Sequence, residues 1–132
     1  MARPRSNSPT PAELEVLKVL WDRGDLTVRE VMEVLNRRQK RAYTSVMSLL
    51  NVMAEKGLLV RKPRGRAFTY AARADREKTR KTILGDLLSR VFEGSASTLV
   101  AQLLEETKPS PEELDRIHGL IESYEEQEER RR

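Results

Sequence analysis

The sequence predicts a mainly α-helical chain with one small β-hairpin. Three observations indicate this fold class: capping signals that precede helical repeats of apolar residues, two short strand-like runs joined by a turn containing Pro and Gly, and amphipathic repeats through the second half. The 132 residues suffice for one small domain with an appendage, but not for two large cores. We expect a disordered arm over residues 1–9, a first domain over 10–72, a helical region over 73–126 and a charged tail over 127–132.

The first helix is predicted to begin at Pro11. Thr10 offers an N-cap hydroxyl, proline suits the first helical position, and Glu13 completes a capping box. Apolar residues then recur at helical spacing as far as Trp21, which we assign to the core, and Gly24 ends the helix because glycine tolerates a left-handed conformation.

A second helix follows a short extended segment. Leu26 is a candidate for a short strand, and Thr27 with Glu30 repeats the capping box. The apolar stripe of this helix ends in the polar run 36–40, where we expect a loop.

The third helix is expected from about Ala42 to Gly57, and its two sides differ in chemistry. One side carries packing residues: Ala42, Val46, Leu49, Leu50 and Met53. The other side carries small polar residues: Thr44, Ser45, Ser48 and Asn51.

Two short strands are predicted at 58–61 and 67–71, with a turn over 62–66. The turn lies in a strongly basic stretch, because residues 37–66 contain nine Lys or Arg and one acidic residue, Glu55. The first 72 residues carry a net charge of +7 and the remainder −3. Such a distribution indicates that the first domain faces a polyanion.

Three helices followed by a basic hairpin correspond to a winged helix-turn-helix, in which the third helix enters the DNA major groove. Short hydroxyl side chains permit close approach to base edges, while Lys and Arg on flanking loops hold phosphates. Thr44, Ser45 and Ser48 are therefore the first candidates for base edges or nearby phosphates, with Tyr43 and Met47 second. The candidates for phosphate contacts are Lys40, Arg41, Arg64 and Arg66. For Tyr43, capping the packing of the third helix is an equally good interpretation. Met47 lies at the edge of the exposed side, and packing is the alternative role for it.

Several functional classes are disfavoured by composition. The chain has no cysteine and a single histidine, His118, so we expect no metal site, no cofactor and no enzymatic activity. No apolar run approaches the roughly 18 to 20 residues that cross a bilayer, and the polar start lacks the apolar centre of a secretory signal. We expect a cytoplasmic protein without membrane insertion.

Specific segments resemble the penicillinase repressor family. The matches to its three helices are 11–21, 26–31 and 42–51; those to its helix end, wing and the joint of its dimerisation region are 55–59, 65–70 and 92–95. The resemblance covers residues 10–124. It implies a bacterial, homodimeric winged-helix repressor that binds a palindromic operator in double-stranded DNA.

The resemblance also gives residues 73–126 a role as a helical dimerisation region. Three short helices form a weak core alone, so pairing with a second copy would bury their apolar stripes. The residues expected at the dimer contact are Ile83, Leu84, Leu87, Leu88, Val91, Phe92, Leu99, Val100, Leu103, Leu104, Leu114, Ile117, Ile121 and Tyr124. From the residues alone, folding of these helices back onto the first domain is an equally good interpretation.

The chain departs from the family pattern in three places. The paired cysteines of copper-sensing members are missing, which excludes copper sensing by that site. Gln102-Leu103 stands where the β-lactam branch has an Asn-Phe cleavage bond, so induction through a membrane sensor-protease stays open but unsupported. Val52 replaces a common arginine, which removes one contact to DNA.

A second interpretation makes the winged helix a protein-interaction module that binds an acidic protein partner. The polar side of the third helix lacks the aromatic anchors of interface hot spots, which favours DNA.

Overall fold

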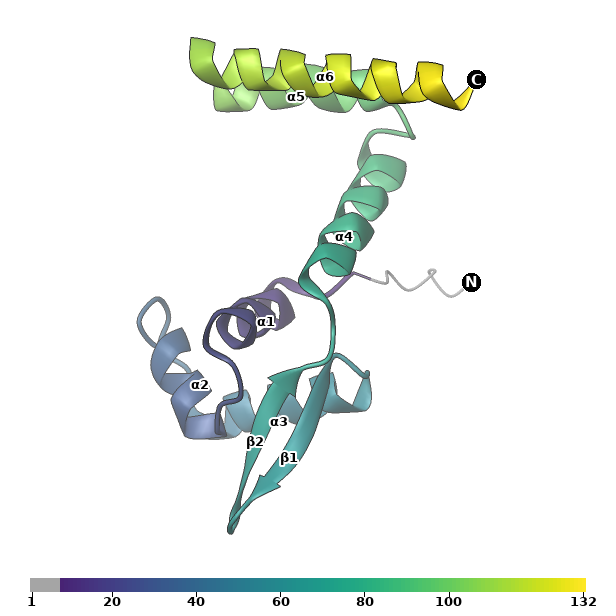
Figure 1. Ribbon diagram of the computed structural model, residues 1–132. Coiled ribbons are helices and arrows are strands. Elements are labelled where there is room, and N and C mark those ends of the chain that lie inside the picture. The colour runs from purple at the N-terminus through teal and green to yellow at the C-terminus, as the bar shows by residue number, and fades with distance from the viewer. Residues whose placement is uncertain (1–7) are drawn as a thin grey trace, which may run out of the picture. The chain divides into compact units, whose positions relative to one another are not determined.

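The computed structural model describes residues 8–132, and in this range the chain forms six helices and one two-stranded antiparallel sheet (Figure 1). The elements are α1 (Pro11–Arg23), α2 (Val28–Leu35), α3 (Tyr43–Glu55), β1 (Leu59–Arg64), β2 (Ala67–Ala72), α4 (Arg76–Val91), α5 (Ala96–Thr107) and α6 (Pro111–Arg131). The predicted fold class is confirmed. Most of the expected N-terminal arm, residues 1–7, lies outside the described residues.

The chain divides into two compact units, Met1–Leu87 and Leu88–Arg132. The boundary falls within α4, and the domain limits expected from the sequence stay a prediction. Among residues 8–132, no helix combines the length and the apolar character that a membrane span requires.

Both predicted capping boxes are present. Thr10 Oγ1 accepts a hydrogen bond from the Glu13 N–H at 3.2 Å, and Glu13 Oε1 accepts one from the Thr10 N–H at 2.9 Å. Thr27 and Glu30 form the same pair of bonds at the start of α2, at 3.2 Å and 3.0 Å. These bonds satisfy backbone donors that have no partner inside the helix, so the local sequence fixes where both helices begin.

The core of the first unit lies between α1, α2, α3 and the hairpin. Its buried residues are Val16, Leu17, Leu20, Val31, Leu35, Val46, Leu50, Met53, Leu59 and Tyr70. Trp21 packs against this cluster, as expected, and its indole N–H donates to the Ala74 carbonyl at 2.8 Å. One detail of α3 differs from the prediction: Ala42 is exposed as the N-cap. Asn51, on the polar side, is half-buried.

The hairpin is more regular than its composition suggested. Strand β1 continues through the expected turn to Arg64, which pairs with Ala67, so only Gly65 and Arg66 form the loop. Gly65 has φ of 62°, and a glycine with positive φ at the first of two loop positions is the requirement of a type II′ turn. The predicted extended residue Leu26 pairs with Tyr70 through backbone bonds of 3.1 Å and 2.7 Å.

Glu13 has a second partner that the sequence did not reveal. Its Oε2 accepts a hydrogen bond from Lys56 Nζ at 2.8 Å, which joins the start of α1 to the end of α3. Burial opposes ionisation of this carboxyl, but the bonds from Lys56 and the Thr10 N–H outweigh it, and its pKa is lowered from the ordinary value of 4.5.

Glu13→Gln should lower the free energy of unfolding at pH 7 by about 1.5 kcal/mol, the lower limit for hydrogen bonds to charged groups, because Lys56 is half exposed. A carboxyl whose pKa is lower in the folded state stabilises the fold at pH values above its unfolded-state pKa. This stabilisation is lost as the pH falls through the folded-state pKa. The difference between the proteins should therefore shrink below pH 4.5. Urea unfolding of both proteins at several pH values measures this difference in the free energy of unfolding. Glu30→Gln, in the capping box without a lysine, should cost less; an equal cost would contradict the role given to Lys56.

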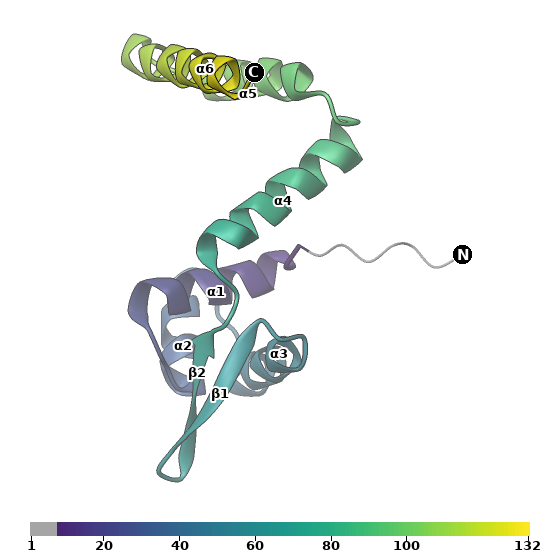
Figure 2. The same cartoon turned by 45° about the vertical axis from the view of Figure 1, so that its right-hand side comes forward.

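The second unit has a different character. Ser95 and Ser110 cap α5 and α6 by accepting hydrogen bonds from backbone N–H groups at 3.2 Å, so the helix starts are locally encoded. The two helices run alongside each other in both views (Figures 1 and 2). Neither contains a buried residue. The helices expected in this region are confirmed, and α6 extends into the expected charged tail.

Candidate nucleic-acid interface

The solvent side of α3 carries the predicted small polar residues. Thr44, Ser45 and Ser48 are all exposed, while Val46 and Leu50 on the opposite side are fully buried. Tyr43 and Met47 lie beside them with exposed fractions of 42% and 39%. The packed side fixes the helix and leaves a shallow, hydroxyl-bearing surface that a duplex can approach closely.

The first turn of α2 connects this surface to the hairpin. The Arg29 guanidinium carbon lies 5.9 Å from the Tyr43 ring centroid, at the start of α3. On the next residue, hydrogen bonds from the Thr27 backbone N–H and side chain lower the pKa of the Glu30 carboxyl, and the charge of Arg64 on β1 lowers it further. The start of α2 therefore lies beside the start of α3, and α2 also contacts β2 of the hairpin.

Residues near the hairpin tip add exposed cations. Arg64 and Arg66 are both exposed, in agreement with their predicted position. Arg61 lies over the ring of Phe68, 4.5 Å from its centroid, and Phe68 itself is 45% exposed. Lys62 Nζ pairs with Asp25 at 3.3 Å, which ties β1 to the segment before α2. In Figures 1 and 2 the hairpin lies beside α3 and its tip projects beyond the helices of this unit.

One hydrogen bond holds the hairpin against α3. The Tyr70 hydroxyl donates to Asn51 Oδ1 at 2.7 Å, and the Tyr70 ring is buried in the core. Helical phase places Asn51 on the polar side, and there the Tyr70 hydroxyl contacts it and leaves it half-buried. This contact sets where the wing lies relative to the exposed residues of α3.

The segment between α2 and α3 contains two predicted phosphate ligands in different settings. Lys40 is exposed. Arg41 is half-buried, its Nη2 donates to Glu15 Oε2 at 3.1 Å, and its backbone N–H donates to Asn36 Oδ1 at 2.8 Å. Its Nε is buried without a hydrogen-bond partner among residues 8–132. The guanidinium thus anchors this loop to α1.

Sequence reasoning missed Arg29, Arg61 and Phe68. The sequence did offer a sign of Arg29, because it is the cation in the first turn of α2 and lies outside the apolar stripe of that helix. Arg61 and Phe68 could be paired only through the strand register, which sequence gives weakly. His118 is exposed, and residues 8–132 contain no group of three or more potential metal ligands.

Comparison with known proteins gives consistent matches. The sequence model described as penicillinase repressor matches residues 9–123. The chain is 26% identical over 113 residues to the penicillinase repressor of Bacillus licheniformis, covering 86% of this chain and 88% of that one. It is 33% identical over 95 residues to the transcriptional regulator BlaI of Mycobacterium tuberculosis, covering 70% and 69%.

A solved structure is also similar. The solution structure of monomeric Bacillus licheniformis BlaI in complex with the blaP half-operator has 27% identity and a TM-score of 0.48, covering 55% of this chain and 89% of that chain.

Proposed function

Because the chain belongs to the penicillinase repressor family, which consists of transcriptional repressors and not of enzymes, we propose that it binds a palindromic operator in double-stranded DNA as a homodimer. In this proposal α3 lies in the major groove and the β1–β2 hairpin lies on the backbone. The observation that carries the proposal is the exposed hydroxyl-bearing side of α3, with Arg29 of α2 beside Tyr43 and exposed arginines on the hairpin that Tyr70 joins to α3.

Base edges are read by the exposed side chains at the start of α3. Thr44, Ser45 and Ser48 can both donate and accept hydrogen bonds, and their small size lets the helix backbone enter the groove. Met47 is placed to contact a thymine methyl, and Tyr43 to contact a sugar or base edge next to Arg29.

Phosphates are held by cations on both flanks of α3. Lys40 lies before the helix, and Arg64 and Arg66 lie on the hairpin; all three are exposed and have no ion-pair partner among the described residues. Arg29 joins them because it lies next to Tyr43. Arg41 is assigned a different role, the positioning of the loop before α3 through Glu15, because its charge is already paired.

The second unit supports dimerisation through its unburied apolar side chains. Leu103 and Ile121 are 50% and 52% exposed in the single chain, and Leu120, which sequence analysis did not assign, is 70% exposed. Helices without a buried residue gain little stability from packing, so most of their stabilising burial must come from a partner surface. A second copy offers the same stripes, and a C2 dimer matches the two-fold symmetry of a palindrome.

Arg64→Ala and Arg66→Ala should each weaken binding to specific and random duplexes alike. If each arginine neutralises one phosphate, each substitution lowers the slope of log Kobs against log salt by about one. Fluorescence anisotropy with labelled duplexes at several salt concentrations measures this slope. Arg116→Ala, at an exposed position on α6, is the matched control and should leave the slope unchanged. Unchanged slopes for both hairpin variants would remove the wing from the interface.

A further inference from the structure

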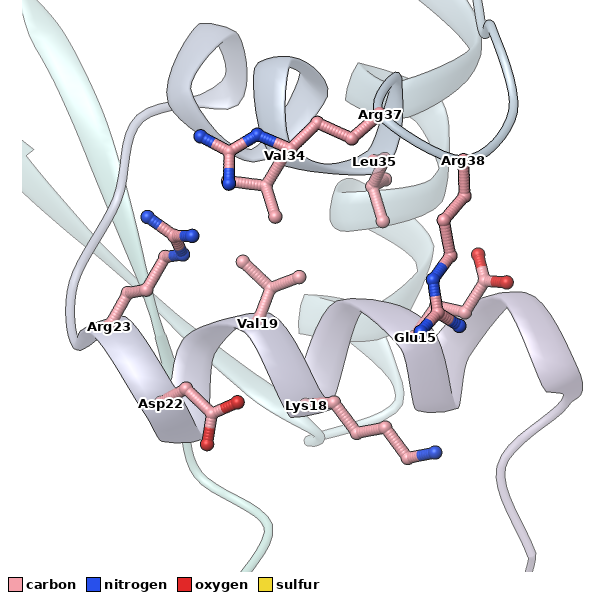
Figure 3. A pocket seen from close by; sticks show the side chains of 9 residues that line it. All are labelled: Glu15, Lys18, Val19, Asp22, Arg23, Val34, Leu35, Arg37 and Arg38. Atoms are coloured by element: carbon pink, nitrogen blue, oxygen red, sulfur yellow. The ribbon is translucent and has the colours of Figure 1, made fainter.

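A cavity of about 330 Å³ lies between α1 and the end of α2, and none of its lining residues is among those assigned to DNA (Figure 3). Figure 3 shows Val19 of α1 and Val34 of α2 facing each other across its centre, with the guanidinium groups of Arg23 and Arg37 at one end. The volume falls at the lower end of the roughly 300 to 1,000 Å³ that is usual for small-molecule sites.

The charges around the cavity are unbalanced. Of the two acidic residues that line it, Asp22 pairs with Arg76 at 2.6 Å and Glu15 pairs with Arg41 at 3.1 Å. Arg23 and Arg37 form no ion pair within residues 8–132, although both line the cavity. Both side chains are exposed, and Figure 3 shows their guanidinium groups at the same end of the cavity, so an anion between them can accept hydrogen bonds from both.

We propose that this cavity binds a small organic anion, with its carboxylate or phosphate between Arg23 and Arg37 and its apolar body over Val19 and Val34. Guanidinium groups bind such oxyanions through paired N–H donors, which orients the ligand. The valine side chains provide the hydrophobic contact that an inorganic ion cannot use. The site therefore selects an amphipathic ligand.

The cavity is connected to the start of α3. Glu15, one of its lining residues, holds Arg41, which directly precedes the α3 N-cap residue Ala42. Arg37 and Arg38, also lining residues, belong to the same segment between α2 and α3. A bound anion reduces the positive charge of this segment and adds negative charge near Glu15, so it lowers affinity for DNA. This regulatory part rests on the proposed function, whereas ligand binding itself does not.

Phenyl phosphate is a suitable probe because it combines a dianion with an apolar ring. In a titration of the isotope-labelled full chain, amide resonances of residues 15–23 and 34–38 should shift and saturate. Phenol and inorganic phosphate, each with one half of the probe, should bind at least tenfold more weakly. Equal affinity for inorganic phosphate, or shifts centred on the hairpin, would overturn the proposed site.

Two variants test the charge and the volume of this cavity separately. Arg23→Gln combined with Arg37→Gln should weaken phenyl phosphate at least tenfold, whereas Arg130→Gln combined with Arg132→Gln, exposed positions at the end of the chain, should not. Val34→Phe should block the ring without changing any charge, and thermal melts check that each variant folds. Unchanged probe affinity in the double variant overturns the proposal. A second outcome also overturns it: the probe shows no saturable binding, and the double variant has a smaller salt slope in DNA binding. These arginines would then be phosphate contacts.

The regulatory part has its own measurement. Saturating phenyl phosphate should weaken binding to an operator or random duplex roughly fivefold, at the lower end of usual couplings between sites, and Val34→Phe should abolish the effect. Saturable probe binding with unchanged DNA affinity would overturn the coupling. A protein that binds the probe but no DNA at all would instead contradict the proposed function.

Discussion

Leu103→Asp combined with Ile121→Asp should produce a monomer whose affinity for a palindromic operator is lower by roughly a hundredfold or more. Both side chains are half exposed in the single chain, so their replacement leaves the packing of the first unit unchanged. At a dimer contact, however, the substitutions would bury charges without partners, which a self-associating surface does not tolerate. Two linked recognition helices gain roughly 10²- to 10⁴-fold over one through effective concentration, and that gain would be lost.

Sedimentation equilibrium and anisotropy on full and half operators measure the two effects together. Gln102→Asp combined with Ser123→Asp is the matched control, since both positions are exposed, polar and close in sequence to the altered pair. The control should remain dimeric and bind normally. In the monomer, affinity for a half operator should persist because the first unit is intact. A Leu103 and Ile121 variant that stays dimeric would place the contact elsewhere and contradict the proposed use of α5 and α6.

Local chemistry made the helix starts and the two sides of α3 predictable. A capping box uses residues only three positions apart, so Thr10 with Glu13 and Thr27 with Glu30 identify helix starts without any tertiary information. The buried side of α3 follows equally from its period, apart from Ala42, which is the exposed N-cap residue. At Asn51 the period gives the polar side but not the burial, because a distant strand, through Tyr70, decides what is covered.

Long side chains were the main source of missed contacts at the candidate site. Arg41 is predicted as a phosphate ligand because it is a cation beside α3, and the sequence did not reveal that its guanidinium pairs with Glu15, 26 positions earlier. Arg29 received no role from the sequence, yet its guanidinium carbon lies 5.9 Å from the Tyr43 ring centroid at the start of α3. Which residues these long side chains contact depends on the angles at which α1, α2 and α3 cross. The spacing of apolar residues along the sequence does not give those angles.

The helical second half shows what a single chain's sequence can and cannot reveal. Its apolar stripes predicted three amphipathic helices, and α4, α5 and α6 are present. The same stripes allowed two destinations, the first domain or a second copy. The sequence could not choose between them because burial of a stripe is a property of the assembly. The proposed dimer uses the second copy, and the exposure of Leu120 adds to the apolar surface available to it.

Ser48→Glu should reduce binding to any duplex by about a hundredfold or more, because it places bulk and negative charge on the side of α3 that meets the groove. A lost base contact costs about 1 to 3 kcal/mol of binding free energy, and a negative charge facing phosphates costs several kcal/mol more. The total exceeds about 2.8 kcal/mol, which corresponds to a hundredfold change in Kd. Ser48 is exposed and mid-helix, where glutamate is a good helix former, so the fold should be retained.

Three matched variants assign the loss to its cause. Gln127→Glu makes the same change of charge on α6 and should bind normally, which isolates position from net charge. Ser48→Gln keeps the size of glutamate without its charge and should bind better than Ser48→Glu, by the share that phosphate repulsion contributes. Ser48→Ala should change preference among operators by about 1 to 3 kcal/mol if the hydroxyl reads a base. An equal loss for Ser48→Ala on every sequence would make that hydroxyl a backbone contact, and normal binding by Ser48→Glu would move the groove-facing surface away from α3 altogether.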